Sequence, residues 1–264
     1  MKPGIVAVPE RREHSNHAEV ARMIAIDIIA GRAKEGSKLA GDAELMLRFG
    51  VSRPVLRESV KTLVAKGLLT TKARVGTVVR ERAAWNMFDG DLLAWHLQAG
   101  IDRRFLDDLA EIRLAVEPRA AALAAERRTE ADLAAMRAGL AAMQREPSDS
   151  VAFANADLAL HVAVANASGN PFMRSVGGVI DVALRASFLL SAPVEDPERD
   201  IVILAHRKIV DAIAARDIEG AADAMVGVIF NGLRRHGAAR TEPSEQLSGQ
   251  HRPIAPSRLL TDKD

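Results

Sequence analysis

The sequence of 264 residues has no cysteine, few aromatic residues and no apolar run long enough to cross a bilayer. Without cysteine, the chain can form neither disulfide bonds nor thiolate metal sites. The first fifteen residues lack the apolar core of a signal peptide, so we expect a cytoplasmic protein without a membrane partner. Only 3% of the residues are aromatic, whereas 48% are hydrophobic. This composition, rich in Ala and Leu, is typical of a mostly helical protein packed with small side chains.

The net charge of +1 conceals an uneven distribution along the chain. Residues 1–82 carry 16 Lys and Arg against 9 Asp and Glu, whereas residues 83–264 carry 20 against 26. A basic N-terminal third followed by an acidic remainder is typical of a DNA-binding module joined to a domain that does not bind DNA. Basic charge alone would be a weak indication, because charged runs are usually only solvated faces.

A helix-turn-helix pattern lies around Gly50. A short helix can begin at Asp42, and Gly50 interrupts it. Ser52 offers a hydroxyl to cap a second helix, and Pro54 falls in that helix's first turn, where a missing N–H costs little. The apolar face of the second helix follows i, i+4, i+7 spacing and comprises Leu56, Val60 and Leu63. Arginines at the start of this helix are typical of a helix that reads DNA.

Two short extended runs follow the second helix, at residues 68–71 and 77–80. They flank a basic tip that contains Lys72, Arg74 and Gly76, and this arrangement predicts a β-hairpin. A hairpin directly after a helix-turn-helix is the wing of a winged helix. The two patterns together indicate DNA binding much more strongly than either one alone.

At these residues the sequence resembles a known family. The run GVSRPVLRESVKTLVAKGLL, followed by KARVGTVV, is similar to the core of the GntR family of bacterial transcription regulators. The resemblance implies that three residues meet the major groove of DNA: Ser52, Arg53 and Arg57. It implies that three others approach the minor groove or the backbone: Lys72, Arg74 and Gly76. The chain departs from the family pattern at Ala43, which replaces a frequent DNA-contacting arginine.

From residue 102 onward the sequence predicts helix after helix and no strand. Amphipathic segments are expected near residues 102–127, 129–145, 148–167, 170–190, 197–216 and 217–236. Helices in this number without a strand signal favour an antiparallel bundle. The predicted fold class is therefore mainly α, with an N-terminal winged helix-turn-helix followed by an all-helical bundle.

The predicted organisation has five parts. They are a disordered arm at 1–15, a winged-helix DNA-binding domain at 16–82, a linker at 83–100, a helical effector-binding domain at 101–238 and a disordered tail at 239–264. Residues 32–41 are expected to form a loop inside the winged helix. In the linker, Asp91 can cap a short helix. Trp85 and Phe88 are expected to anchor the linker by packing against a domain.

The helical region resembles the FCD effector domain, which follows the winged helix in the FadR-type branch of the GntR family. The matching runs are EIRLAVEPRAAALAA, DLALHVAVANASGNPFM and AHRKIVDAIAARDIEGAADAM. Within that branch, the linker resembles that of the galactonate-operon repressor type. The resemblance covers nearly the whole of residues 17–236.

Three residues of the helical region are candidate metal ligands. Asp157 and His161 share one helix face at i, i+4 spacing, and His206 lies in an apolar stretch of another predicted helix. Taken alone, they are more simply interpreted as an Asp–His pair and a satisfied core histidine. The FCD resemblance implies instead that they are three of four metal ligands, and oxygen and imidazole ligands suit Zn, Ni or Mn. The fourth family position is Val228, which cannot bind a metal.

Arg113 is the first candidate for binding a small-molecule effector. It lies on the first bundle helix, where a guanidinium facing an apolar interior needs a carboxylate. That carboxylate is either an internal partner, with Glu111, Glu117 and Asp157 as candidates, or a bound acid. The FCD resemblance implies that Arg113 holds the carboxylate of the effector. Arg185 is a second candidate, through similarity to the galactonate type alone.

Motifs of the common enzyme classes are absent from the sequence. It has no phosphate-binding glycine loop, no Gly-x-Ser-x-Gly elbow and no His-Glu-x-x-His run, so we expect no enzyme. We predict a homodimeric transcription regulator that binds a palindromic operator in double-stranded DNA. A small carboxylate controls it, and it represses a sugar-acid or other small-carboxylate catabolic operon. The alternatives are a metal-dependent small-molecule enzyme and an architectural protein that binds DNA without sequence preference.

Overall fold

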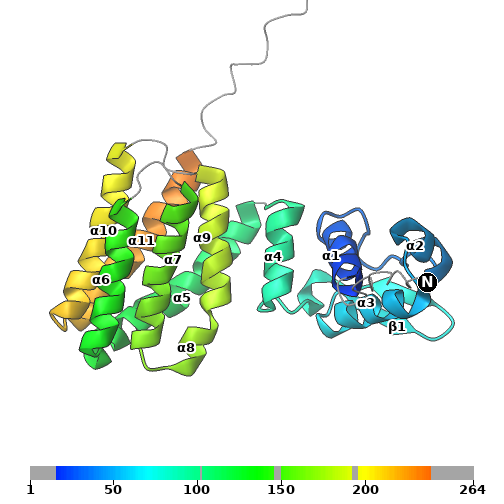
Figure 1. The fold of residues 1–264 in the computed structure, drawn as a ribbon, viewed down its shortest axis with the longest axis horizontal. Coiled ribbons are helices and arrows are strands. Elements are labelled where there is room, and N and C mark those ends of the chain that lie inside the picture. The colour runs from blue at the N-terminus through cyan, green and yellow to red at the C-terminus, as the bar shows by residue number, and fades with distance from the viewer. Residues whose placement is uncertain (1–15, 102, 146–149, 192–195, 239–264) are drawn as a thin grey trace, which may run out of the picture.

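The computed structural model describes residues 16–101, 103–145, 150–191 and 196–238, and the predicted disordered arm and tail lie outside these ranges. Two groups of elements lie along the long axis of the molecule (Figure 1). A bundle of helices occupies one end, helices with a small hairpin occupy the other, and α4 lies between them. Helices make up most of the described chain, which confirms the predicted fold class.

Three helices and a hairpin form the N-terminal group. The helices are α1 Asn16–Ile29, α2 Asp42–Phe49 and α3 Arg53–Ala65. Gly50 joins α2 to α3 with φ of 63°, a left-handed conformation that glycine adopts at little cost, and its N–H donates to the Met46 carbonyl. The side chains of Leu56 and Leu63 on α3 are fully buried in a cluster shared with α1 and the hairpin. The helix-turn-helix is thus held on its inner face by apolar packing.

The starts of helices α2 and α3 both differ from the prediction. Gly41, and not Asp42, precedes α2, and Asp42 is already helical. Ser52 does precede α3, but its hydroxyl makes no capping hydrogen bond to the described backbone. Pro54 lies in the first turn of α3 and lacks an N–H, so a cap has one donor fewer to satisfy.

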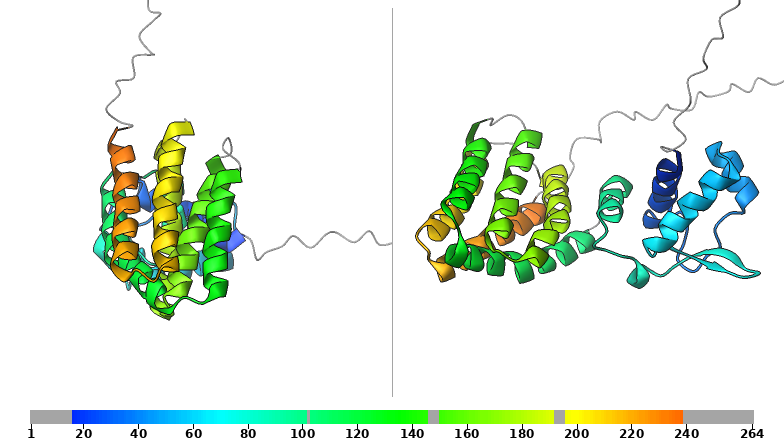
Figure 2. Two further views of the ribbon diagram at one scale, coloured as in Figure 1. Left: turned by 90° about the vertical axis from the view of Figure 1, so that its left-hand side faces the viewer. Right: turned by 60° about the horizontal axis from the view of Figure 1, so that its bottom comes forward.

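The wing consists of β1 Leu69–Lys72 and β2 Gly76–Val79, which pair antiparallel with Leu69 opposite Val79. Both strands lie one residue closer to the tip than the sequence predicts. The segment expected as a loop at 32–41 is partly ordered against β2, because Lys38 forms a bridge with Val78 and Leu39 N–H donates to the Thr77 carbonyl at 2.9 Å. Figure 2 shows the hairpin at the end of the molecule farthest from the bundle.

The linker contains a short 3-10 helix, η2 Arg82–Ala84, and helix α4 Gly90–Ala99. Asp89, and not Asp91, caps α4, because its carboxylate accepts a hydrogen bond of 3.0 Å from Leu92 N–H. Trp85 is buried as expected. Phe88 is 61% exposed, so the expectation that it anchors the linker is wrong.

Helix α4 belongs to both halves of the molecule. Leu92 is fully buried in the apolar cluster of the winged helix, whereas its neighbour Leu93 is fully buried in a different cluster with Phe105 and Val179 of the bundle. Consecutive helical residues point about 100° apart, so two faces of one helix serve two cores.

The remaining helices form the bundle (Figures 1 and 2). They are α5 Arg103–Arg127, α6 Glu130–Arg145, α7 Ser150–Ala167, α8 Pro171–Ser175, α9 Gly177–Ser191, α10 Asp196–Ala214 and α11 Ile218–Ala238. The segment 170–190 is not one helix as predicted, because it divides at Val176 into α8 and α9. Gly177 and Gly178 follow the break, and two adjacent glycines disfavour a continuous helix.

Small residues allow the bundle helices to approach one another closely. A Cβ atom on Gly139 of α6 would lie 3.2 Å from the backbone of Leu160 on α7. On α5, which packs against α11, Ala121, Ala124 and Ala125 are fully buried. This packing explains how a core with so few aromatic residues is filled.

Candidate functional site

The first candidate site lies on α3 and the wing. Arg53, Arg57 and Lys61 line a hollow of about 620 Å³ that also includes Thr71 and Thr77 of the hairpin strands. Lys61 forms an ion pair of 2.8 Å with Glu58, whereas neither Arg53 nor Arg57 forms an ion pair with any described residue. Two exposed, unpaired guanidinium groups can bind phosphate oxygens or the O6 and N7 atoms of guanine.

The start of α3 adds further donors to this face. Ser52 is exposed, and its hydroxyl is free to bind a ligand, because it is not used as a cap within the described chain. The first N–H groups of a helix carry the positive end of its dipole, which favours a phosphate. The structure therefore brings Ser52, Arg53 and Arg57 together on one exposed surface.

The tip of the wing presents Lys72, Arg74 and Gly76, and all three are exposed. Arg74 has φ of 64°, a left-handed conformation that costs a residue other than glycine roughly 1–2 kcal/mol. Gly76 has φ of 104°, and a Cβ atom there would lie 2.9 Å from Cε of Lys38. Gly76 thus shapes the wing, whereas Lys72 and Arg74 supply its charge.

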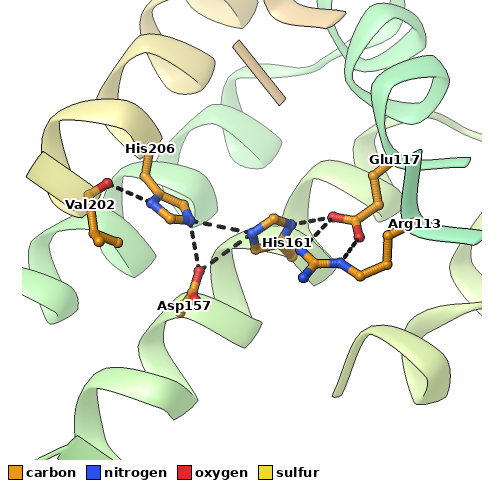
Figure 3. Close-up of polar contacts among 6 residues, drawn as sticks. All are labelled: Arg113, Glu117, Asp157, His161, Val202 and His206. Atoms are coloured by element: carbon orange, nitrogen blue, oxygen red, sulfur yellow. Dashed lines mark hydrogen bonds and ion pairs between the residues drawn. The ribbon is translucent and has the colours of Figure 1, made fainter. Parts of the chain in front are cut away.

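The second candidate site is buried in the bundle (Figure 3). Asp157 and His161 come from one face of α7, His206 comes from α10, and their exposed fractions are 5%, 1% and 2%. Asp157 Oδ1 lies 2.8 Å from His206 Nε2 and 3.4 Å from His161 Nε2, and the two Nε2 atoms are 3.3 Å apart. The structure thus brings all three predicted metal ligands together around one point.

The outer nitrogen of each imidazole has its own acceptor. Nδ1–H of His206 donates to the Val202 carbonyl at 2.7 Å, and Nδ1–H of His161 donates to the Glu117 carboxylate (Figure 3). In the neutral rings both Nε2 lone pairs therefore face Asp157. His206 Nε2 lies close to Oδ1 of Asp157, but the two atoms do not form a hydrogen bond. Oδ1 of Asp157 is therefore buried without a hydrogen-bond donor among the described groups. Three converging acceptors need a cation or a proton between them, and this donor set fits a divalent metal ion.

The charges of the cluster are strongly coupled. Burial acts to raise the pKa of Asp157, but the two imidazoles hold that pKa below its usual range. Burial also acts to lower the pKa of His161, yet the carboxylates of Glu117 and Asp157 raise it to about 9. A positive charge next to Asp157 is therefore favoured, and a metal ion would displace the proton of His161.

Val228 lies on α11, at the position where the resemblance to the FCD domain predicts a fourth ligand. Its side chain is 8% exposed, and it packs in the main apolar cluster of the bundle. A valine has no donor atom, so the described residues supply three ligands at this point. A site with three protein ligands keeps a coordination position for water or for a bound molecule.

Arg113 has an internal partner. Its Nε donates to Oε1 of Glu117 at 2.5 Å, and both side chains are buried. Burial acts to raise the pKa of Glu117, but Arg113 and His161 lower that pKa to about 2. One of the two interpretations left open by the sequence, the internal salt bridge, is therefore present in the structure. The sequence predicts Glu117 only as a partner of Arg113. The spacing of four residues between them gives no sign of the contact between Glu117 and His161.

Arg185 makes no contact with Arg113, Glu117 or the Asp157 cluster among the described interactions. Its side chain is 44% exposed, and its Nε donates to Asp181 on the same helix at 2.7 Å. The buried face of α9 is formed by other residues, including Val179 and Val182. The structure does not bring Arg185 into contact with the buried cluster, and its role as an effector contact stays a prediction.

Comparison with known proteins identifies the family. Residues 16–79 match the bacterial regulatory proteins of the gntR family, and residues 108–231 match the FCD domain. The galactonate operon transcriptional repressor of Escherichia coli (strain K12) is 34% identical over 208 residues, which cover 79% of this chain and 91% of that protein. The chain belongs to the GntR family. This result confirms the family resemblance seen in the sequence.

Other comparisons agree with the assignment to the GntR family. An Escherichia coli protein named for the L-lactate dehydrogenase operon that it is inferred to regulate is 31% identical over 243 residues, which cover 88% of this chain and 93% of that one. The solved structure of Lar, which controls expression of the Listeria monocytogenes agr system, covers 89% of this chain and 99% of its own. Its TM-score is 0.62 at 19% identity, which supports the fold alone.

Membership of the GntR family decides the general function. The chain is a DNA-binding transcription regulator and not an enzyme, which removes the alternative of a metal-dependent enzyme. The part that matches the gntR family contains all the predicted DNA-binding residues, and the part that matches the FCD domain contains the buried cluster of Asp157, His161 and His206. No helix in the described part of the chain has the length and apolar character needed to cross a membrane.

Proposed function

We propose that this GntR-family regulator is a homodimeric repressor of a catabolic operon for a sugar acid or another small carboxylate, and that the acid controls its binding to DNA. The observation that carries the proposal is the convergence of Asp157, His161 and His206, which offer three ligands around one point. A divalent ion held by three protein ligands keeps a coordination position for another molecule. A hydroxy acid offers carboxylate and hydroxyl oxygens for such a position. Two relatives are named for operons of galactonate and L-lactate metabolism, and both compounds are hydroxy acids.

The metal site needs both its ligands and the groups behind them. Asp157, His161 and His206 would hold a Zn, Ni or Mn ion, while Glu117 and the Val202 carbonyl keep the imidazoles in the required tautomer. The ion would supply a Lewis-acidic position for an oxygen of the acid. Because Val228 leaves that position to a small molecule, the effector can complete the coordination shell.

The DNA side of the proposal rests on α3 and the wing. Two copies of α3 in a symmetric dimer would read the two halves of a palindromic operator. In each copy, Arg53 and Arg57 have no ion-pair partner among the described residues that would compete with DNA. The wing adds the charges of Lys72 and Arg74 at the adjacent backbone or minor groove.

The packing also offers a route for coupling between the two sites. Glu117, which bonds to His161, lies on α5, and Phe105 near the start of α5 packs with Leu93 of α4. The opposite side of α4 packs in the core of the winged helix through Leu92. An effector changes DNA affinity only when it binds the two dimer arrangements with different strength, and α5 and α4 together link the arrangement of the helices to the cluster.

The proposal is tested by measuring operator binding by fluorescence anisotropy while hydroxy acids are titrated, with galactonate and L-lactate as the first probes. We expect at least one acid to weaken operator binding by tenfold or more in zinc-loaded protein, and to have little effect after treatment with EDTA. The variant Asp157→Asn should retain operator binding and lose the response to the acid. An equal response of wild type and Asp157→Asn, with and without EDTA, would show that the metal cluster is not the effector site.

A further inference from the structure

A second buried guanidinium of the bundle, Arg199 on α10, has no anionic partner among the side chains that the structure describes. Its side chain is 6% exposed, and no hydrogen bond or ion pair joins it to any other described residue. Its Nε is buried and unsatisfied. The guanidinium carbon lies 5.2 Å from the centre of the Phe153 ring, close enough for a cation–π contact. The ring offers no oxygen to accept a hydrogen bond, so Nε–H of Arg199 stays unsatisfied within the described chain.

Other arginines of the bundle show what a satisfied guanidinium looks like in this protein. Arg113 is equally buried, and it pairs with Glu117. Arg127 donates to the Ser168 carbonyl at 3.0 Å, and Arg128 donates to the Ala214 carbonyl at 2.9 Å. Among the residues whose side chains are described, Arg199 departs from this pattern, so its Nε–H can bind an anion that enters from outside the chain.

Arg199 lines a hollow of about 780 Å³ between α6 and α10. The remaining lining residues include three apolar side chains, one amide and one side chain of each charge: Met143, Ile203, Leu204, Gln144, Asp200 and Arg207. Neither Asp200 nor Arg207 forms an ion pair within the described ranges, so Asp200 does not neutralise Arg199. Leu204 is 55% exposed, so the hollow is open to solvent. A buried guanidinium beside methionine, isoleucine and leucine side chains suits a carboxylate that carries a hydrocarbon body.

The hollow is separate from the metal cluster. Its described lining includes none of the three cluster residues, and His206 lies seven positions after Arg199 on α10. Seven residues correspond to about 10 Å along a helix. A ligand in the hollow therefore engages Arg199 without needing the metal ion.

We propose that Arg199 anchors the carboxylate of a second small molecule, a short-chain aliphatic monocarboxylate, in the hollow between α6 and α10. The carboxylate accepts hydrogen bonds from the guanidinium, and the aliphatic chain packs against Met143, Ile203 and Leu204. This site goes beyond the proposed effector site, because it has a different anchor and prefers an apolar rather than a hydroxylated body.

The test uses hexanoate as the probe and the full-length protein treated with EDTA, with binding measured by isothermal titration calorimetry. We expect hexanoate to bind once per chain and to raise the melting temperature. Hexan-1-ol, which has the same chain without the charge, should bind at least tenfold more weakly. Arg199→Met should abolish binding of hexanoate, while the control Arg137→Met, an exposed arginine of α6 outside the hollow, should bind it as the wild type does.

A second variant guards against a failure of Arg199→Met to fold. Removal of an uncompensated buried charge should leave the bundle at least as stable as before. Leu204→Glu places a negative charge at an exposed position in the hollow and should reduce hexanoate affinity at least tenfold. The proposal is overturned if wild type does not bind hexanoate, if hexan-1-ol binds equally well, or if Leu204→Glu binds as tightly as wild type. Loss of binding in Asp157→Asn with retention in Leu204→Glu would also overturn it, because the probe would then occupy the metal cluster. DNA release is not measured, so the result is independent of the proposed function.

Discussion

The carboxylate of Glu117 accepts hydrogen bonds from two buried donors, Nε of Arg113 and Nδ1 of His161. A glutamine at this position has nearly the same shape but only one acceptor oxygen, so Glu117→Gln leaves one donor without a partner. An unsatisfied buried donor costs about 1–3 kcal/mol, and breaking a buried ion pair costs about 3–5 kcal/mol in all. We therefore expect Glu117→Gln to lower the free energy of unfolding of the metal-free protein by about 3–5 kcal/mol.

The same substitution acts on the proposed metal site. Loss of the carboxylate that orients His161 should weaken zinc affinity by about 10–100-fold, as is usual when the hydrogen-bond partner of a metal-binding histidine is removed. Glu111→Gln is the matched control, because Glu111 lies on the same helix and is exposed, and its effect on stability should stay within about 0.5 kcal/mol.

Urea unfolding followed by circular dichroism gives the free energy of unfolding, and calorimetric titration with zinc gives the zinc affinity. The double variant Arg113→Met with Glu117→Gln should recover part of the lost stability, because it removes both charges of the buried pair. Equal stability of Glu117→Gln and wild type would refute the assignment of Glu117 as the bridge between Arg113 and His161.

Three further changes test other parts of the molecule. Arg57→Ala should weaken operator binding by about 1–3 kcal/mol in an anisotropy titration, and equal affinity of variant and wild type would contradict the role of α3 in reading DNA. Val228→His should tighten zinc binding in calorimetry by restoring a fourth ligand, and absence of zinc uptake in both proteins would show that the cluster is not a metal site. Gly139→Val should destabilise the bundle in urea by about 1–3 kcal/mol, because the added atoms meet the backbone of Leu160. Gly178→Ala is the control for this change, because no atom lies within 4 Å of its Cβ position, and it should stabilise by about 0.5–1 kcal/mol.

The features that the sequence predicts well are those with a local physical cause. The helix-turn-helix follows from the periodicity of α3 and from Gly50, and the wing follows from two extended runs around a basic tip. Thr129 and Asp132 form a reciprocal cap at the start of α6, since each side chain accepts a hydrogen bond from the backbone N–H of the other. The i, i+4 spacing of Asp157 and His161 required only that α7 be a helix.

The features that it predicts poorly depend on packing between distant segments. Asp89 and Asp91 are both chemically able to cap α4, and the choice between them depends on how the chain leaves the wing. Phe88 was expected to be buried because of its residue type, yet its neighbours leave it exposed. The contact of Glu117 with His161 and the isolation of Arg199 arise from the approach of α5 to α7 and of α10 to α6, which no spacing within one helix reveals.

The use of α4 by two cores has a consequence for the geometry of operator recognition. Leu92 and Leu93 are fixed in different cores, so α4 cannot turn about its axis without exposing one of them, at a cost of about 1.5–3 kcal/mol for each leucine. The orientation of α4 about its axis is therefore fixed relative to both cores, and its length can change only in whole residues. Each residue added between Leu92 and Leu93 would rotate the winged helix by about 100° relative to the bundle and move it by about 1.5 Å along the axis of α4. In the proposed dimer, the separation of the two half-sites would therefore change in discrete steps with the length of this helix.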